Sequence, residues 1–163
     1  CEWVRECFAW FAVHRSRAEP GPASRVLLTV DVHQIAMWIC CEVVSPDLVR
    51  TAVRVPGMLR TVSNDSWFGA SIGAGQHLQM ARLRALENER DMVRATNNGV
   101  TAIIDHQGKI RAQLPQFEAC VLRGEVTVRS GDTPYHRFGD YPVLLVCLVL
   151  LAAAIWQRPR MRE

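Results

Sequence analysis

The chain has 163 residues, of which 49% are hydrophobic, and carries a formal net charge of +3 at pH 7. A chain of this length and composition can bury a core, so an extended disordered tail is excluded. The positive charge is spread along the sequence except for a C-terminal cluster, so we expect no nucleic-acid partner. The six cysteines include no C-x-x-C pair and lack histidines at zinc spacing, so we expect no metal site.

Strand patterns alternate with helical patterns along the first 130 residues. In chain order we expect strands at 26–32 and 34–39, a helix at 46–54, a strand at 58–62, a loop at 63–75, a helix at 76–90, strands at 92–95, 100–105, 110–114 and 118–128, and a hairpin turn at 106–109. The strand candidates are short apolar runs bounded by Gly, Pro, Asn or Asp, whereas the second helix has apolar residues at helical spacing. This alternation predicts an α/β layered fold.

An uncharged segment follows at 141–156, with Asp140 before it and Arg158, Arg160 and Arg162 after it. As a helix it would be roughly 24 Å long, slightly shorter than a bilayer core of about 30 Å. Its aromatic ends and the arginines beyond favour a transmembrane helix with a cytoplasmic C-terminus, and a buried core helix is the alternative. The predicted division of the chain is a catalytic domain at 1–130, a linker at 131–140, a transmembrane helix at 141–157 and a cytoplasmic tail at 158–163.

Cys40 is the candidate nucleophile. It lies where an apolar strand ends and a turn toward a helix begins, a position at which a nucleophile is presented above a sheet. A thiolate there could attack an acyl ester and form a thioester that an amine later opens. The alternative is that Cys40 is a small buried hydrophobic residue, as most free cysteines are.

Several motifs resemble one known family. WICCEVVSP stands at 38–46, and SND-x-WFG, RALE and ATNNG-x-T-A-I-ID follow it in the family's order. Together they resemble the apolipoprotein N-acyltransferases, a membrane-bound branch of the carbon–nitrogen hydrolase (nitrilase) superfamily. The resemblance implies part of an αββα sandwich, with Cys40 as the nucleophile. It also implies transfer of an acyl chain from a phospholipid to the N-terminal diacylglyceryl-cysteine of an apolipoprotein, without a cofactor. The implied location is a bacterial inner membrane, with the lipid bilayer as a partner and the catalytic domain in the periplasm.

The resemblance also assigns supporting residues. Glu42 matches a glutamate that closes the cysteine motif, and is predicted to be catalytic or to orient groups near the thiol; a solvated turn residue is the alternative. Cys41 replaces the tyrosine that the family usually has there, which puts substrate positioning in doubt. Cys41 and Glu2 are expected from the resemblance to bind substrate or support the site. The loop residues Asn64, Asp65, Trp67 and Phe68 are expected to do so because they follow the end of a strand in an open α/β sheet. The loop residues among them form either a wall of the acyl-binding cleft or an Asx turn with aromatic packing.

Three other polar positions are given structural roles. We expect His77 to cap or pack rather than catalyse, since the resembled family has no histidine in its triad. Glu87 is expected to accept a buried hydrogen bond, and the Asn97-Asn98-Gly99 stretch to form a turn.

Two partners of the family's Glu-Lys-Cys triad are not found ahead of Cys40. Lys109 is the only lysine and follows the cysteine in a predicted turn, and Glu2 matches at best a supporting glutamate. The chain is therefore interpreted as a piece of a longer enzyme or as a degenerate paralogue, and is expected to be inactive alone. A nitrilase-type amidase and a non-catalytic, membrane-anchored module are the alternatives.

Overall fold

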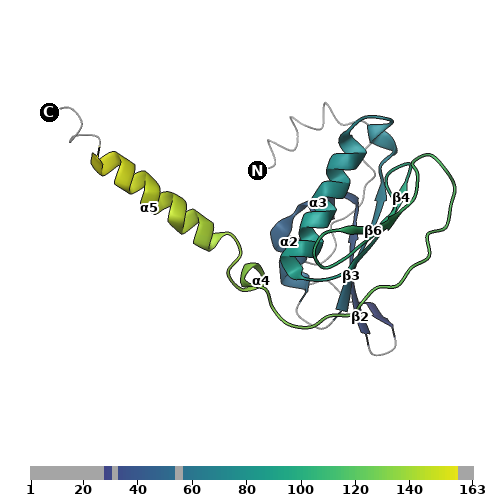
Figure 1. The fold of residues 1–163 in the computed structure, drawn as a ribbon, viewed down its shortest axis with the longest axis horizontal. Helices are drawn as coiled ribbons and strands as arrows, with labels where there is room; N and C mark the ends of the chain where they lie inside the picture. The colour runs from purple at the N-terminus through teal and green to yellow at the C-terminus, as the bar shows by residue number, and fades with distance from the viewer. Residues whose placement is uncertain (1–27, 31–32, 54–56, 158–163) are drawn as a thin grey trace, which may run out of the picture.

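The structure is a computed structural model that describes residues 28–30, 33–53 and 57–157. These residues form a six-stranded sheet in the order β1 to β6, with two of the helices packed beside it and the last helix projecting away from it (Figure 1). In chain order the elements are β1 (Leu28–Val30), β2 (His33–Ile39), the 3₁₀ helix η1 (Cys40–Val44), α2 (Pro46–Ala52), β3 (Gly57–Asn64), the 3₁₀ helix η2 (Ser66–Phe68), α3 (Gly73–Asn88), β4 (Met92–Asn97), β5 (Ala102–Ile104), β6 (Ile110–Gln113), α4 (Pro134–Phe138) and α5 (Tyr141–Gln157).

The three central strands are parallel. β2 pairs with β3 and β3 with β4 in parallel register, whereas β1, β5 and β6 are added in antiparallel fashion. The register aligns Ile39 with Val62 and Val62 with Ala95, so the carboxyl ends of these strands lie at one edge of the sheet. In an open α/β sheet this edge is where ligands bind.

One face of the sheet carries the hydrophobic core. Side chains on this face alternate with those of the other face along each strand, and Trp38, Leu59 and Met92 are fully buried there. Val49 of α2 and Ala81 of α3 belong to the same buried cluster, so these two helices cover this face. The predicted α/β layered fold is confirmed. Within the described residues it comprises one sheet and one helical layer of the expected αββα sandwich.

Most predicted elements are present, with shifted bounds. The predicted strand at 26–32 is described only at Leu28–Val30, and the expected loop at 63–75 includes the end of β3, η2 and the first turn of α3. The predicted strand at 118–128 is wrong. Residues 118–128 form no strand, because they do not make the regular backbone hydrogen bonds of a sheet. Thr127 N instead donates to the side-chain atom Asp91 Oδ2 over 2.9 Å, and Arg129, the residue after this stretch, forms an isolated bridge with Gly57.

The predicted transmembrane helix at 141–157 is not supported. α5 has 17 residues, so it is about 26 Å long and shorter than a bilayer core of about 30 Å. Within 28–30, 33–53 and 57–157, no helix has the length and apolar character needed to cross a membrane. The alternative of a buried core helix is also wrong, because residues 141–156 are all exposed and α5 projects from the sheet (Figure 1). The expected linker at 131–140 contains α4, and the tail at 158–163 lies outside the described residues.

Candidate active site at the carboxyl edge of the sheet

Cys40 forms a sharp elbow between β2 and η1. Its φ angle is 50°, a left-handed conformation that residues other than glycine rarely adopt and that is often found at functional sites. The thiol is partly exposed and has no disulfide partner. The structure therefore places Cys40 in the strand–elbow–helix geometry that presents a nucleophile.

Glu42 stabilises the turn from inside it. Its carboxylate Oε2 accepts a hydrogen bond from the backbone N–H of Ile39 over 2.7 Å, which ties the third residue of η1 back to the end of β2. This bond fits the orienting role that the sequence suggested for Glu42. Its participation in proton transfer stays a prediction.

Cys41 lies beside the candidate nucleophile. The Sγ atoms of Cys40 and Cys41 are 3.8 Å apart, and Cys41 is exposed. Burial, the hydrogen bond with Cys40 and the negative charges of Cys40 and Asp65 raise the pKa of the Cys41 thiol. These surroundings therefore favour the protonated form of the Cys41 thiol.

A buried polar cluster lies at the same edge, and we call Ser63, Asp65, His77 and Arg94 the Asp65 cluster. Asp65 Oδ1 accepts from Ser63 Oγ over 2.5 Å and is 2.9 Å from His77 Nδ1, while Asp65 Oδ2 accepts from Arg94 Nη2 over 2.7 Å. All four residues are buried, and Asp65 and Arg94 are 0% exposed. The carboxylate thus joins the end of β3 to α3 and β4.

The cluster holds Asp65 ionised. Burial acts to raise the pKa of the Asp65 carboxyl, but the hydrogen bond from Ser63 and the charge of Arg94 outweigh it, so the pKa is lowered. The backbone encloses the same group: Asp65 N donates to Asn97 O over 3.1 Å, and a Cβ at Gly99 would collide with the carboxylate. Glycine is therefore required at position 99.

The structure separates the loop residues that the sequence grouped together. Asp65 is buried, so it does not line a cleft, and its supporting role at the site stays a prediction; His77 packs in the cluster as expected. Trp67 is 79% exposed, whereas the Phe68 ring lies edge-on to the His77 ring with centroids 6.0 Å apart. Asn64 Oδ1 accepts from Ser66 N over 3.2 Å, which is the Asx turn considered as an alternative. Their contact with substrate stays a prediction.

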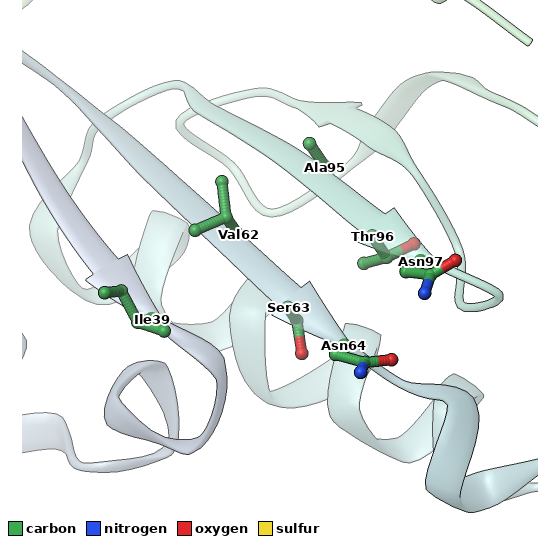
Figure 2. Close-up of a pocket in the computed structure, with 7 residues that line it drawn as sticks. All are labelled: Ile39, Val62, Ser63, Asn64, Ala95, Thr96 and Asn97. Carbon is green, nitrogen blue, oxygen red and sulfur yellow. The ribbon is translucent and has the colours of Figure 1, made fainter. Parts of the chain in front are cut away.

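A shallow hollow of about 360 Å³ lies beside the elbow. Figure 2 shows the side chains of Val62 and Ala95 on one side of the sheet and that of Ser63 pointing to the other. The hollow is mostly apolar, with polar groups near the strand ends; its lining residues are Ile39, Val62, Ser63, Asn64, Ala95, Thr96 and Asn97. Ile39, which precedes Cys40, is the lining residue that connects this hollow to the elbow.

Sequence reasoning missed Arg94. The available signal was a charged residue at an inward-facing position of the strand, two residues after the buried Met92. A buried guanidinium requires an acidic partner, and Asp65 supplies it. Glu87 has its expected role as a hydrogen-bond acceptor, because its Oε1 accepts from Arg84 Nη2 over 2.6 Å. Arg84 Nη1 donates in turn to Val44 O at the end of η1.

Lys109 lies far from the elbow, in the predicted hairpin turn between β5 and β6. Lys109 O accepts from Asp105 N over 2.9 Å, and β5 aligns Ile104 with Met92 at the amino end of β4. Cys40 lies at the opposite, carboxyl edge, so Lys109 is not placed to assist it. Glu2 lies outside the described residues. Among the described residues, no three His, Cys, Asp or Glu side chains gather to hold a metal ion.

Comparison with known proteins identifies the family. The carbon-nitrogen hydrolase model matches residues 10–135, and the chain belongs to the carbon-nitrogen hydrolase family. A Pseudomonas aeruginosa relative named apolipoprotein N-acyltransferase is 47% identical over 155 residues, which are 95% of this chain and 30% of the relative. A Vibrio vulnificus protein of the same name is 46% identical over 158 residues, 96% of this chain and 31% of its own length. The chain thus spans about a third of these relatives.

Solved structures agree on the fold. A carbon-nitrogen hydrolase from Helicobacter pylori has a TM-score of 0.52 at 12% identity, over 62% of this chain and 43% of the other. Saccharomyces cerevisiae Nit3, a member of branch 10 of the nitrilase superfamily, has a TM-score of 0.50 at 19% identity, over 62% and 40%. At such identities the likeness concerns the fold alone.

The Asp65 cluster predicts a pH-dependent loss of stability. Asp65→Asn should lower the free energy of unfolding by about 3 kcal/mol or more at pH 7, because Arg94 is left buried without its counter-charge. The lowered pKa means that this contribution is present above the unfolded-state value of about 3.9 and is lost as the pH falls through the lower folded-state value. Urea unfolding at pH 7 and at progressively lower pH should show that the difference in the free energy of unfolding between the unsubstituted protein and Asp65→Asn becomes smaller as the pH falls.

Asp47→Asn is the matched control. Asp47 pairs with Arg50 over 2.9 Å but is 72% exposed, so its removal should cost less than about 1 kcal/mol at any pH. A cost for Asp65→Asn as small as that for Asp47→Asn would show that the cluster does not hold this edge of the sheet together.

Proposed function

We propose that this chain carries the nucleophile of an apolipoprotein N-acyltransferase. The observation that carries the proposal is the positive-φ elbow of Cys40 beside an apolar hollow, in a chain about 46% identical to proteins of that name. Proposed substrates are a phospholipid acyl donor and the N-terminal diacylglyceryl-cysteine of an apolipoprotein, and no cofactor is required.

The chemistry proceeds in two steps. A base takes the proton of the Cys40 thiol, the thiolate attacks the ester carbonyl of the phospholipid, the ester C–O bond breaks, and the lysophospholipid leaves with that proton. The α-amine of the apolipoprotein then attacks the thioester, the base takes the proton that the amine loses, the C–S bond breaks, an amide forms, and the thiol is restored by that proton. Dividing one difficult transfer into two suits a donor and an acceptor that are both lipids.

The chain requires groups beyond its own to do this. The resemblance implies a glutamate that takes the thiol proton and a lysine that stabilises the oxyanion, and both would precede the cysteine. No lysine precedes Cys40 in the sequence, and Lys109 lies at the other end of the sheet. Since each such group is typically worth about 10²–10³ in rate, we expect the 163-residue chain to be inactive alone.

We further propose that α5 contacts lipid at a bacterial inner membrane. Residues 141–156 carry no charge and are all exposed, so the helix presents apolar side chains on every side. Such a surface is unfavourable in water and favourable against acyl chains. A periplasmic catalytic domain belongs to the same proposal; the cytoplasmic C-terminus expected from the sequence would require α5 to cross the membrane, and the arginines that suggested it lie outside the described residues.

The nucleophile can be tested in a chimera, in which this chain replaces the matching segment of the Pseudomonas aeruginosa relative. The chimera should restore growth to a strain depleted of its own acyltransferase. Cys40→Ser should abolish rescue and lower acyl transfer to a lipoprotein peptide by about 10³-fold or more, because the nucleophile is removed. Cys41→Ser is the matched control and should retain rescue.

Rescue by Cys40→Ser would rule out Cys40 as the nucleophile. If the chimera does not restore growth but releases ammonia from small amides, the result would favour the alternative function of a nitrilase-type amidase. The absence of either activity in a folded chimera would favour the non-catalytic module.

The lipid contact predicts vesicle binding. The 163-residue chain should float with phospholipid vesicles, and Leu148→Glu, in the middle of α5, should reduce the bound fraction several-fold because it places a charge in the apolar surface. Leu86→Glu is the control, since Leu86 is an exposed leucine on α3. Equal flotation of the two variants would show that α5 does not mediate binding.

A further inference from the structure

Arg94 has more hydrogen-bonding capacity than its partners use. Its Nη2 donates to Asp65 Oδ2 over 2.7 Å and lies 3.1 Å from His77 Nδ1. The remaining two guanidinium nitrogens, Nε and Nη1, have no hydrogen-bond partner among the described residues, although the side chain is 0% exposed. A buried donor without a partner is costly, so it is usually retained for a reason other than stability.

The register places this guanidinium near the elbow. Trp38, Thr61 and Arg94 are aligned across β2, β3 and β4 and are all buried on the helix-covered face. Cys40 follows Trp38 by two positions and comes directly after the carboxyl end of the same strand. β2 and β4 are separated by β3 alone, so their axes are roughly 10 Å apart, and an arginine side chain extends over most of that distance.

Both charges of the Asp65–Arg94 ion pair interact with a thiol at this edge. Burial lowers the pKa of the Arg94 guanidinium, while Asp65 and the negative charge of Cys40 act in the opposite direction. Asp65 also acts on Cys41, where it raises the thiol pKa. The negative member of the ion pair therefore affects the neighbouring thiol, and the positive member interacts with Cys40.

We infer that Arg94 is a positioning residue that supplies a positive electrostatic potential at the Cys40 thiolate. It acts through space from behind the elbow and is held there by Asp65, so it contacts no substrate and is not a catalytic residue. The inference rests on the proposed function only for the identity of Cys40 as the nucleophile. It gives the elbow a fixed positive charge in a chain whose only lysine lies at the opposite end of the sheet.

Two alkylating reagents measure this potential directly. Iodoacetate is an anion and iodoacetamide is neutral, and both react with the same thiolate, so the ratio of their rate constants cancels the thiolate fraction. The ratio at Cys40 is compared with that at Cys120, an exposed thiol of the same molecule, by peptide mass spectrometry in a Cys41→Ser background. We expect the Cys40 ratio to exceed the Cys120 ratio by at least about threefold. A Cys40 ratio equal to or below that of Cys120 overturns the inference.

Variants assign the effect to Arg94. Arg94→Met combined with Asp65→Asn removes the pair without leaving a buried unpaired charge, and should bring the Cys40 ratio down to the Cys120 ratio. Arg94→Lys should keep most of the excess, a rescue that a purely structural role would not produce. Arg111→Met removes the same charge from β6 and should change nothing. If the Cys40 ratio still exceeds the Cys120 ratio in the double variant, and its far-UV circular dichroism is intact, the inference is overturned. If the double variant unfolds, the inference is decided by the comparison of Cys40 with Cys120 in the protein that retains Asp65 and Arg94.

The experiment contains neither phospholipid nor acceptor. A raised ratio in a protein whose chimera transfers no acyl chain contradicts the proposed function alone. A ratio that is not raised, together with acyl transfer lost in Cys40→Ser, contradicts only the role of Arg94.

Discussion

The ion pair between Asp65 and Arg94 is the interaction on which the candidate site depends. Both side chains are fully buried, and the carboxylate also engages Ser63 and His77. Bringing two charges into a core costs about as much as their attraction returns, so the pair contributes geometry more than net stability. Its partners come from β3, α3 and β4, so none of these elements can shift at this edge without breaking a buried bond.

This constraint reaches the elbow through packing. η1 contacts both β3 and α3, and Arg84 donates from α3 to Val44 O at the end of η1. The hydrophobic core, which includes Trp38 of β2 and Leu59 of β3, holds β2 in position against β3. Cys40 can then be held at a φ of 50° because the structure on either side of it is already determined.

The fold was predictable where the sequence has a clear period. Short apolar runs bounded by glycine, proline, asparagine or aspartate indicated β2, β3 and β4, and the apolar stripe of α3 indicated its helix. The stretch at 118–128 misled because its β-branched residues have strand propensity, whereas pairing depends on neighbours that are distant in sequence. α5 was recognised as an apolar helix, but its length falls below what a membrane crossing needs.

The site was predictable only in part. The candidate Cys40 came from a strand that ends at a turn together with the family resemblance, and the candidate Glu42 came from the resemblance alone. The partnership of Asp65, His77 and Arg94 could not be predicted from spacing, because it joins positions 12 and 29 residues apart through tertiary packing. The charge of Arg94 at an inward position of β4 was the overlooked signal, and it points to an acidic partner without identifying which residue that is.

The central claim is that the elbow makes Cys40, and not the adjacent Cys41, the acyl-carrying thiol. The most direct measurement is mass spectrometry of the peptide containing both cysteines, after the chimera has reacted with phospholipid in the absence of an acceptor. The account predicts one added acyl mass on Cys40 that neutral hydroxylamine removes, as expected for a thioester. An acyl mass on Cys41, or one that resists hydroxylamine, would contradict it.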